Sequence, residues 1–106
     1  MRHLSIDIET YSSVPIAKAG LYKYAQSPDF EILLFAWSWN FGPVQICDLT
    51  TENQLPESVL KALPDPEIQK HAYNAAFEWY CLSRYLGGHL PISQWRDTML
   101  HALYCG

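Results

Sequence analysis

The chain has few basic residues, and this shortage limits what it can bind through charge alone. Seven Lys and Arg residues stand against eleven Asp and Glu residues among 106, so the formal net charge is −4. A nucleic-acid-binding protein normally shows a basic footprint, and the chain as a whole lacks one. An acidic total is still compatible with a nuclease whose own carboxylates hold metal ions. Charge alone therefore does not indicate a nucleic-acid partner.

Paired cysteines and long apolar segments are also missing. Cys47, Cys81 and Cys105 are odd in number and form no C-x-x-C motif, which predicts free thiols in a reducing compartment. The longest apolar run, residues 32–39, is far too short to span a bilayer. The N-terminal residues show a strand pattern and no signal-peptide pattern. We expect a soluble, cytoplasmic protein without a membrane partner.

What the chain does contain is enough apolar side chain for a core. Hydrophobic residues make up 49% and aromatic residues 14%, which excludes disorder, and the length fits one domain or part of one. Hydrophobic periodicity and turn residues predict five strands and three helices. The expected strands cover residues 3–8, 31–40, 44–49, 67–73 and a short piece at 94–96; the expected helices cover 56–63, 75–86 and 98–105. Residues 10–29 are expected to form an ordered excursion with one helical turn. This order predicts an α/β mixed sheet with three antiparallel N-terminal strands, then parallel strands, and helices packed on it.

Two carboxylates stand at the end of the first predicted strand. Asp7 and Glu9 are two residues apart, so both project from the same face of the sheet. Like charges this close repel each other. The pair is tolerated if water solvates it, if one group keeps its proton, or if a metal cation neutralises both. An isolated pair of this kind does not discriminate among these three states.

A second polar cluster follows the fourth predicted strand. Asn74 directly precedes the helix predicted at 75–86, and Glu78 lies in its first turn. The other residues of this helix are almost all apolar. If the fourth strand lies beside the first, both clusters meet at the crevice where open α/β sheets bind ligands. Glu78 is then either a solvated first-turn residue or a metal ligand next to Asp7 and Glu9. Asn74 is either a helix cap or a substrate contact, and Phe77 is either a core residue or a surface on which a base stacks.

These motifs resemble those of a known family. Residues 5–10 (S-I-D-I-E-T) are similar to the first motif, and residues 71–78 (H-A-Y-N-A-A-F-E) to the second motif, of the DEDD, or DnaQ-like, 3′–5′ exonucleases. Residues 96–99 (R-D-T-M) resemble a segment of the proofreading domains of family A DNA polymerases, and residues 11–14 and 20–25 resemble phage-type and prophage-type members. The similarity covers essentially the whole chain. It implies an RNase H-like fold and the hydrolysis of DNA from a single-stranded 3′ end with two Mg²⁺ or Mn²⁺ ions.

The resemblance also implies roles for individual residues. Asp7, Glu9 and Glu78 match the catalytic carboxylates that bind the metal ions, although the family's second motif carries Asp where this chain has Glu78. Thr10, Asn74 and Phe77 match positions that line the substrate cleft. Asp97 matches a position outside the metal site, and we interpret it as the cap of the helix predicted at 98–105.

The family's third motif, Y-x-x-x-D or H-x-x-x-x-D, is absent from residues 1–106. The expectation is therefore a single partial exonuclease domain that lacks the C-terminal polymerase region, is inactive or nearly so by itself, and forms homo-oligomers through exposed apolar surface. The implied setting is the cytoplasm of a bacterium that carries a phage or prophage. The alternative is a non-catalytic nucleic-acid-binding or protein-binding module with the same fold. Another RNase H-like enzyme, such as a resolvase, is disfavoured by the N-x-x-F and D-T-M patterns.

Overall fold

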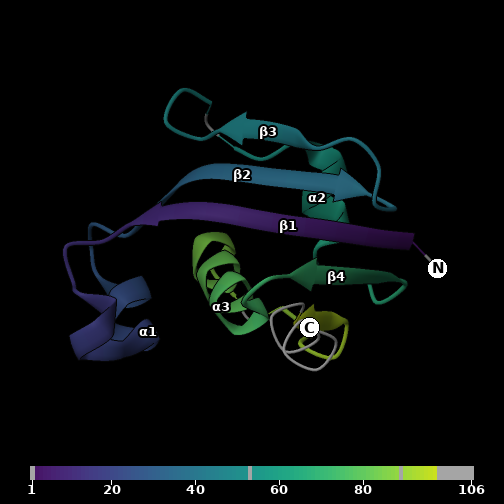
Figure 1. The fold of residues 1–106 in the computed structure, drawn as a ribbon. Helices are drawn as coiled ribbons and strands as arrows, with labels where there is room; N and C mark the ends of the chain where they lie inside the picture. The colour runs from purple at the N-terminus through teal and green to yellow at the C-terminus, as the bar shows by residue number, and fades with distance from the viewer. Residues whose placement is uncertain (1, 53, 89, 98–106) are drawn as a thin grey trace.

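The computed structural model describes residues 2–52, 54–88 and 90–97. Within these ranges the chain forms five strands and three helices, which confirms the predicted α/β architecture (Figure 1). Their order is β1 (Arg2–Tyr11), α1 (Ile16–Gln26), β2 (Glu31–Trp39), β3 (Gln45–Asp48), α2 (Glu57–Ala62), β4 (Ile68–Ala72), α3 (Ala75–Leu86) and β5 (Trp95–Asp97).

The five strands form a single mixed sheet in the order β3-β2-β1-β4-β5. β1 pairs with β2 antiparallel and β2 with β3 antiparallel, as the sequence predicted. β4 pairs with the other edge of β1 in parallel, and β5 pairs with β4 in parallel. β1 therefore has an antiparallel neighbour on one edge and a parallel neighbour on the other. The carboxyl end of β4 lies next to the middle of β1. This is the position at which an open α/β sheet leaves a crevice for a ligand.

The sequence of β1 alternates, and the alternation sets its two faces. Leu4, Ile6 and Ile8 are buried, whereas the odd-numbered residues between them lie on the opposite face. Ile6 and Ile8 oppose Trp37 and Phe35 of β2, both of which are also buried. Burial of these side chains contributes to the hydrophobic stabilisation on this face of the sheet.

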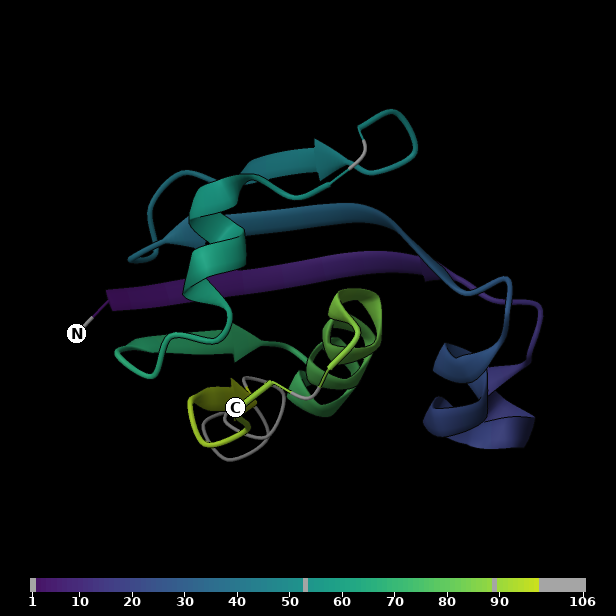
Figure 2. The ribbon, with the colours of Figure 1, turned by 180° about the vertical axis from the view of Figure 1, so that it is seen from behind.

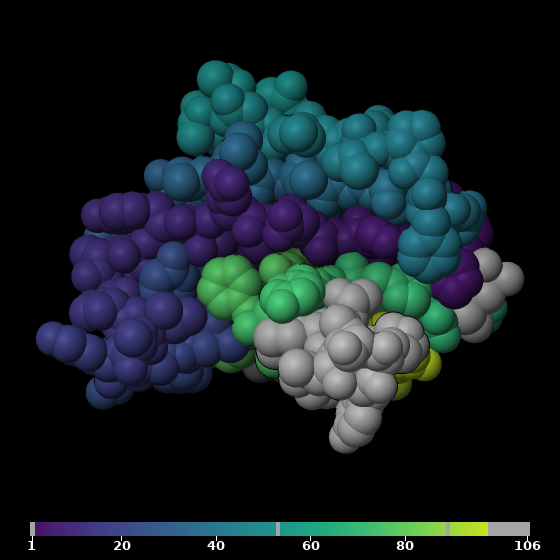
Figure 3. All heavy atoms as spheres, in the orientation of Figure 1, coloured from purple at the N-terminus to yellow at the C-terminus, as the bar shows by residue number. Residues whose placement is uncertain are grey.

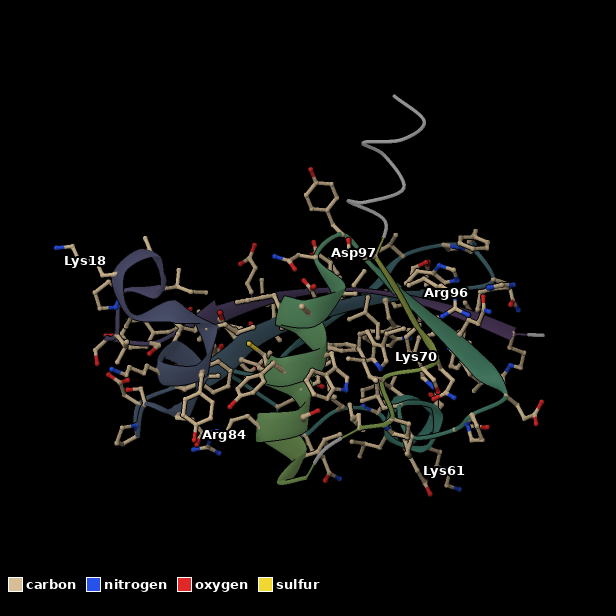
Figure 4. The ribbon with its side chains drawn as sticks, turned by 90° about the horizontal axis from the view of Figure 1, so that it is seen from below. Lys18, Lys61, Lys70, Arg84, Arg96 and Asp97 are labelled. Atoms are coloured by element: carbon tan, nitrogen blue, oxygen red, sulfur yellow. The ribbon has the colours of Figure 1, made fainter. Side chains whose placement is uncertain are left out.

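α2 and α3 cover the face that carries these apolar residues. Figure 2, which is seen from the side opposite to Figure 1, shows α2 crossing in front of β1 and β2. Its buried residues Val59 and Ala62 belong to the same core cluster as Leu4. α3 begins beside the end of β4 and runs across the sheet toward the same side as α2 (Figure 4). None of the described helices is long and apolar enough to cross a bilayer.

Two features differ from the sequence-based expectation. The excursion before β2 contains an eleven-residue helix, α1, and not a single turn; its backbone breaks at Gly20, whose φ of 89° is unfavourable for other residues. Asp97 is the last residue of β5, and the helix predicted at 98–105 lies outside the described residues, as does Cys105. Cys47 and Cys81 are buried free thiols, as predicted.

Candidate functional site

β1 presents Asp7 and Glu9 on the face opposite the core. Both side chains are exposed, and the buried Ile6 and Ile8 on either side of Asp7 fix the orientation of the strand. The pairing with β2 shifts register between Glu9 and Thr10, so the strand bends directly after the second carboxylate. In the space-filling view β1 forms a band across this face, with the beginning of α3 directly against it (Figure 3).

The start of α3 is fixed by a cap and by burial. The Asn74 side-chain oxygen accepts a hydrogen bond from the Phe77 backbone N–H at 3.4 Å, so Asn74 is the N-cap. At the other end, Gly87 has φ 79° and closes the helix with its N–H on the Arg84 carbonyl. The cap interpretation of Asn74 is confirmed by this geometry. Its role toward a substrate stays a prediction.

Glu78 lies in the first turn of α3 and is buried. Its side chain is only 5% exposed, and Oε2 has no hydrogen-bond partner among the described residues. The exposed, solvated state considered for Glu78 is therefore wrong. Burial is the main factor that raises the pKa of the carboxyl to about 7, and the negative charge of Asp7 and, more weakly, that of Asp97 act in the same direction. Hydrogen bonds with backbone groups at the helix start oppose this rise only in part.

The structure thus brings carboxylates from three separate elements into electrostatic contact. Asp7 comes from β1, Glu78 from α3 and Asp97 from β5, where it pairs with Ala72 at the end of β4. Figure 4 shows Asp97 beside the start of α3. The sequence interpretation of Asp97 as a helix cap missed this neighbourhood. Its position directly after a short strand was the available signal, because carboxyl ends of adjacent parallel strands meet at one edge of a sheet.

The carboxylates do not converge on a single point. Within residues 2–52, 54–88 and 90–97, no group of three His, Cys, Asp or Glu side chains is close enough to hold one metal ion. Next to Asp7 the exposed face of the sheet has an open hollow of about 220 Å³. Its lining residues are Ser5, Ile6, Asp7, Ala36, Trp37, Ser38 and Val44. The site is therefore an acidic, open surface with one buried and uncompensated carboxyl at its edge.

Thr10 and Phe77, which the sequence placed at a substrate cleft, are joined through a residue of α1. The Thr10 hydroxyl and the Tyr24 hydroxyl are 2.8 Å apart, and the Tyr24 ring lies 6.3 Å from the Phe77 ring between centroids. All three side chains are half-buried. No sequence pattern indicated this link, because it depends on how α1 folds back onto the end of β1.

Comparison with known proteins places the chain in a broader context. Over all 106 residues it is 49% identical to a protein of Bacillus phage SP02 that carries the name DNA polymerase. The chain is similar to a phage DNA polymerase. It spans 16% of that polymerase, about a sixth of its length. No protein-family model matches the chain. The predicted relationship to a phage DNA polymerase is confirmed by this similarity, whereas the exonuclease activity and the residue roles stay predictions.

Proposed function

We propose that these residues belong to a metal-dependent 3′–5′ exonuclease site of a DNA polymerase, built on an RNase H-like fold. The observation that carries the proposal is the Glu78 carboxyl, which is buried, lacks a partner for Oε2 and faces the negative charge of Asp7. A buried carboxyl that is repelled by its neighbours either keeps its proton or is compensated by a ligand, and carboxyls perturbed in this way are concentrated at functional sites. The similarity to a phage DNA polymerase supplies the biochemical setting.

Divalent cations fit the chemistry of this site. Mg²⁺ and Mn²⁺ prefer carboxylate oxygens, and a cation beside Asp7 and Glu78 would remove the repulsion that raises the pKa of Glu78. The described carboxylates do not meet at one point. We propose Asp7, Glu9 and Glu78 as ligands. When bound, two such ions would supply a nucleophilic water and stabilise the leaving 3′-oxygen.

The remaining residues would act on the DNA strand. Thr10 directly follows Glu9 at the register shift in β1, and its hydroxyl, 2.8 Å from that of Tyr24, would contact the DNA strand. Phe77 presents a half-buried ring at the start of α3, where a base of single-stranded DNA would stack. Asn74 holds the helix start in place through its cap, and this in turn fixes Phe77 and Glu78 relative to β1.

The proposal is tested by hydrolysis of single-stranded DNA by the full natural chain in Mn²⁺. We expect the wild type to release nucleoside monophosphates and Asp7→Asn and Glu78→Gln to lower the rate about 100-fold or more, because each removes a carboxylate that holds the cation. Glu67→Gln is the matched control, since Glu67 is an exposed carboxylate before the opposite end of β4. Wild-type rates in both site variants would overturn the proposal.

One observation favours the second candidate, a non-catalytic binding module. The exposed face also carries large apolar side chains, Phe41, Val44 and Ile46, each about two-thirds exposed. If the module function is correct, the full chain binds a partner but shows no Mn²⁺-dependent hydrolysis, and Asp7→Asn leaves divalent-metal titrations unchanged.

A further inference from the structure

α1 carries the side chain that connects the two predicted substrate contacts. Thr10 is the first residue after the register shift in β1, and its hydroxyl hydrogen-bonds to the hydroxyl of Tyr24 at 2.8 Å. A threonine hydroxyl that has no fixed partner rotates freely, whereas a bound one has a defined direction. The bond therefore sets where the Thr10 hydroxyl points at the edge of the acidic site.

The ring of Tyr24 is itself held from two sides. It makes an edge-to-face contact with Phe30, with centroids 6.0 Å apart, and a tilted contact with Phe77 at 6.3 Å. Aromatic pairs of this geometry favour one ring orientation. Tyr24 thus links Thr10 of β1 to Phe77 of α3, two positions far apart in the sequence, through one rigid side chain.

The second half of α1 is attached to α3 by further contacts. The Gln26 side-chain amide donates to the Tyr80 hydroxyl at 3.1 Å, and the Tyr22 ring lies 5.9 Å from the Tyr80 ring. The break at Gly20 separates this half from the first turns of α1. The position of Tyr24 is consequently set by α3, the same helix that carries Phe77 and Glu78.

The charge of α1 fits a polyanionic partner. Its residues include Lys18 and Lys23 and no acidic residue, so this helix has a formal charge of +2 in a chain whose total is −4. α2 and α3 each carry one acidic and one basic residue. Lys18 extends outward from α1 (Figure 4). The side of the site formed by α1 is therefore more favourable for a phosphate backbone than the acidic end of β1.

We propose that Tyr24 is a positioning residue for the single-stranded DNA substrate: it orients the Thr10 hydroxyl and supports the Phe77 ring against the terminal nucleotides. The proposal rests on the exonuclease function proposed above. Tyr24 acts through its neighbours and has no part in the hydrolytic step. Its loss should weaken substrate binding while the bound substrate still reacts at the normal rate.

Steady-state hydrolysis of short single-stranded DNA by the full natural chain in Mn²⁺ tests this role. Tyr24→Phe removes only the hydroxyl, and we expect it to raise KM about two- to tenfold, the value of one hydrogen bond, while kcat stays within about twofold. Thr10→Val removes the hydroxyl that Tyr24 orients and should raise KM at least as much, whereas Thr10→Ser, which keeps the hydroxyl, should retain the wild-type KM. The double variant Thr10→Val/Tyr24→Phe should be no worse than Thr10→Val alone, because both changes remove the same bond.

Tyr22→Phe is the matched control. Tyr22 lies on the same helix but is two-thirds exposed, and KM should not change. An unchanged KM for Tyr24→Phe, a loss confined to kcat, or multiplied effects in the double variant would overturn the positioning role and leave the exonuclease function standing. Absence of hydrolysis by the wild type would overturn both proposals.

Discussion

Replacing Glu78 with Gln should stabilise the metal-free protein, and the gain should depend on pH in a defined way. Burial and the neighbouring negative charges raise the pKa of Glu78 from 4.5 to about 7 in the folded state. The folded protein therefore holds this proton more tightly than the unfolded chain does. Stability contributed by the protonated group is fully present below pH 4.5, declines as pH rises from 4.5 to 7, and is lost above that range.

The size of the effect follows from the same numbers. A shift of one pKa unit corresponds to about 1.4 kcal/mol. The rise of the Glu78 pKa from 4.5 to about 7 therefore lowers the free energy of unfolding at pH 8 by about 3 kcal/mol. Glu78→Gln has no such proton, so its free energy of unfolding should lack this decline. The stability difference between variant and wild type should then grow by about 3 kcal/mol between pH 4.5 and pH 8. Comparing the two pH values cancels any fixed difference between the carboxyl and amide groups.

Urea unfolding in a chelator, followed by tryptophan fluorescence, measures this difference directly because the chain has four Trp residues. Glu67→Gln is the control: its carboxylate is exposed, and its stability should follow the wild type at every pH. If the curves for Glu78→Gln and wild type run parallel from pH 4.5 to pH 8, the reasoning from burial and charge is refuted.

Three further predictions concern metal binding and local structure. At pH 8, Mn²⁺ at ten times its dissociation constant should stabilise the wild type by about 1.4 kcal/mol, and Asp7→Asn should lose most of this gain in a thermal melt; equal shifts in both proteins would contradict a role of Asp7 in metal binding. Gly20→Ala should cost about 1–3 kcal/mol, because φ is 89° and ψ is 167°, whereas Gly88→Ala, at a position without positive φ and with open space around it, should cost far less in the same urea assay. Asn74→Ala should cost about 0.5–2 kcal/mol through loss of the cap of α3, and an unchanged urea midpoint would show that the cap contributes nothing.

The sequence predicted the regular elements well where one physical pattern dominated. The alternation in β1 and the apolar run in β2 fix strands with a buried face, and the Asn74 cap with the glycines after Leu86 defines α3 from both ends. α1 was underestimated because its helical pattern is interrupted at Gly20. Its folding depends on contacts with Tyr80 of α3, which no local pattern contains.

The candidate site was predicted in part for the same reason. Asp7 and Glu78 were placed at one crevice by strand order alone, and in the structure burial and the negative charge of Asp7 raise the pKa of Glu78. The burial of Glu78 was not predicted, since it depends on how closely α3 packs against the sheet. Asp97 and Tyr24 were missed as neighbours of the site because their proximity arises from β5 pairing and from the fold-back of α1. Contacts between side chains of different elements depend on how those elements pack against one another. The sequence pattern of a single element does not encode this packing.

The polarity of DNA degradation by the full natural chain is the most direct test of the exonuclease assignment. One single-stranded oligonucleotide is labelled at its 3′ end and another at its 5′ end, and both are incubated with the protein and Mn²⁺. The proposed site predicts immediate release of the 3′ label as a mononucleotide, a ladder of progressively shorter 5′-labelled products, and loss of both with Asp7→Asn. Release of the 5′ label first, internal cleavage, or no metal-dependent cleavage by the wild type would contradict it.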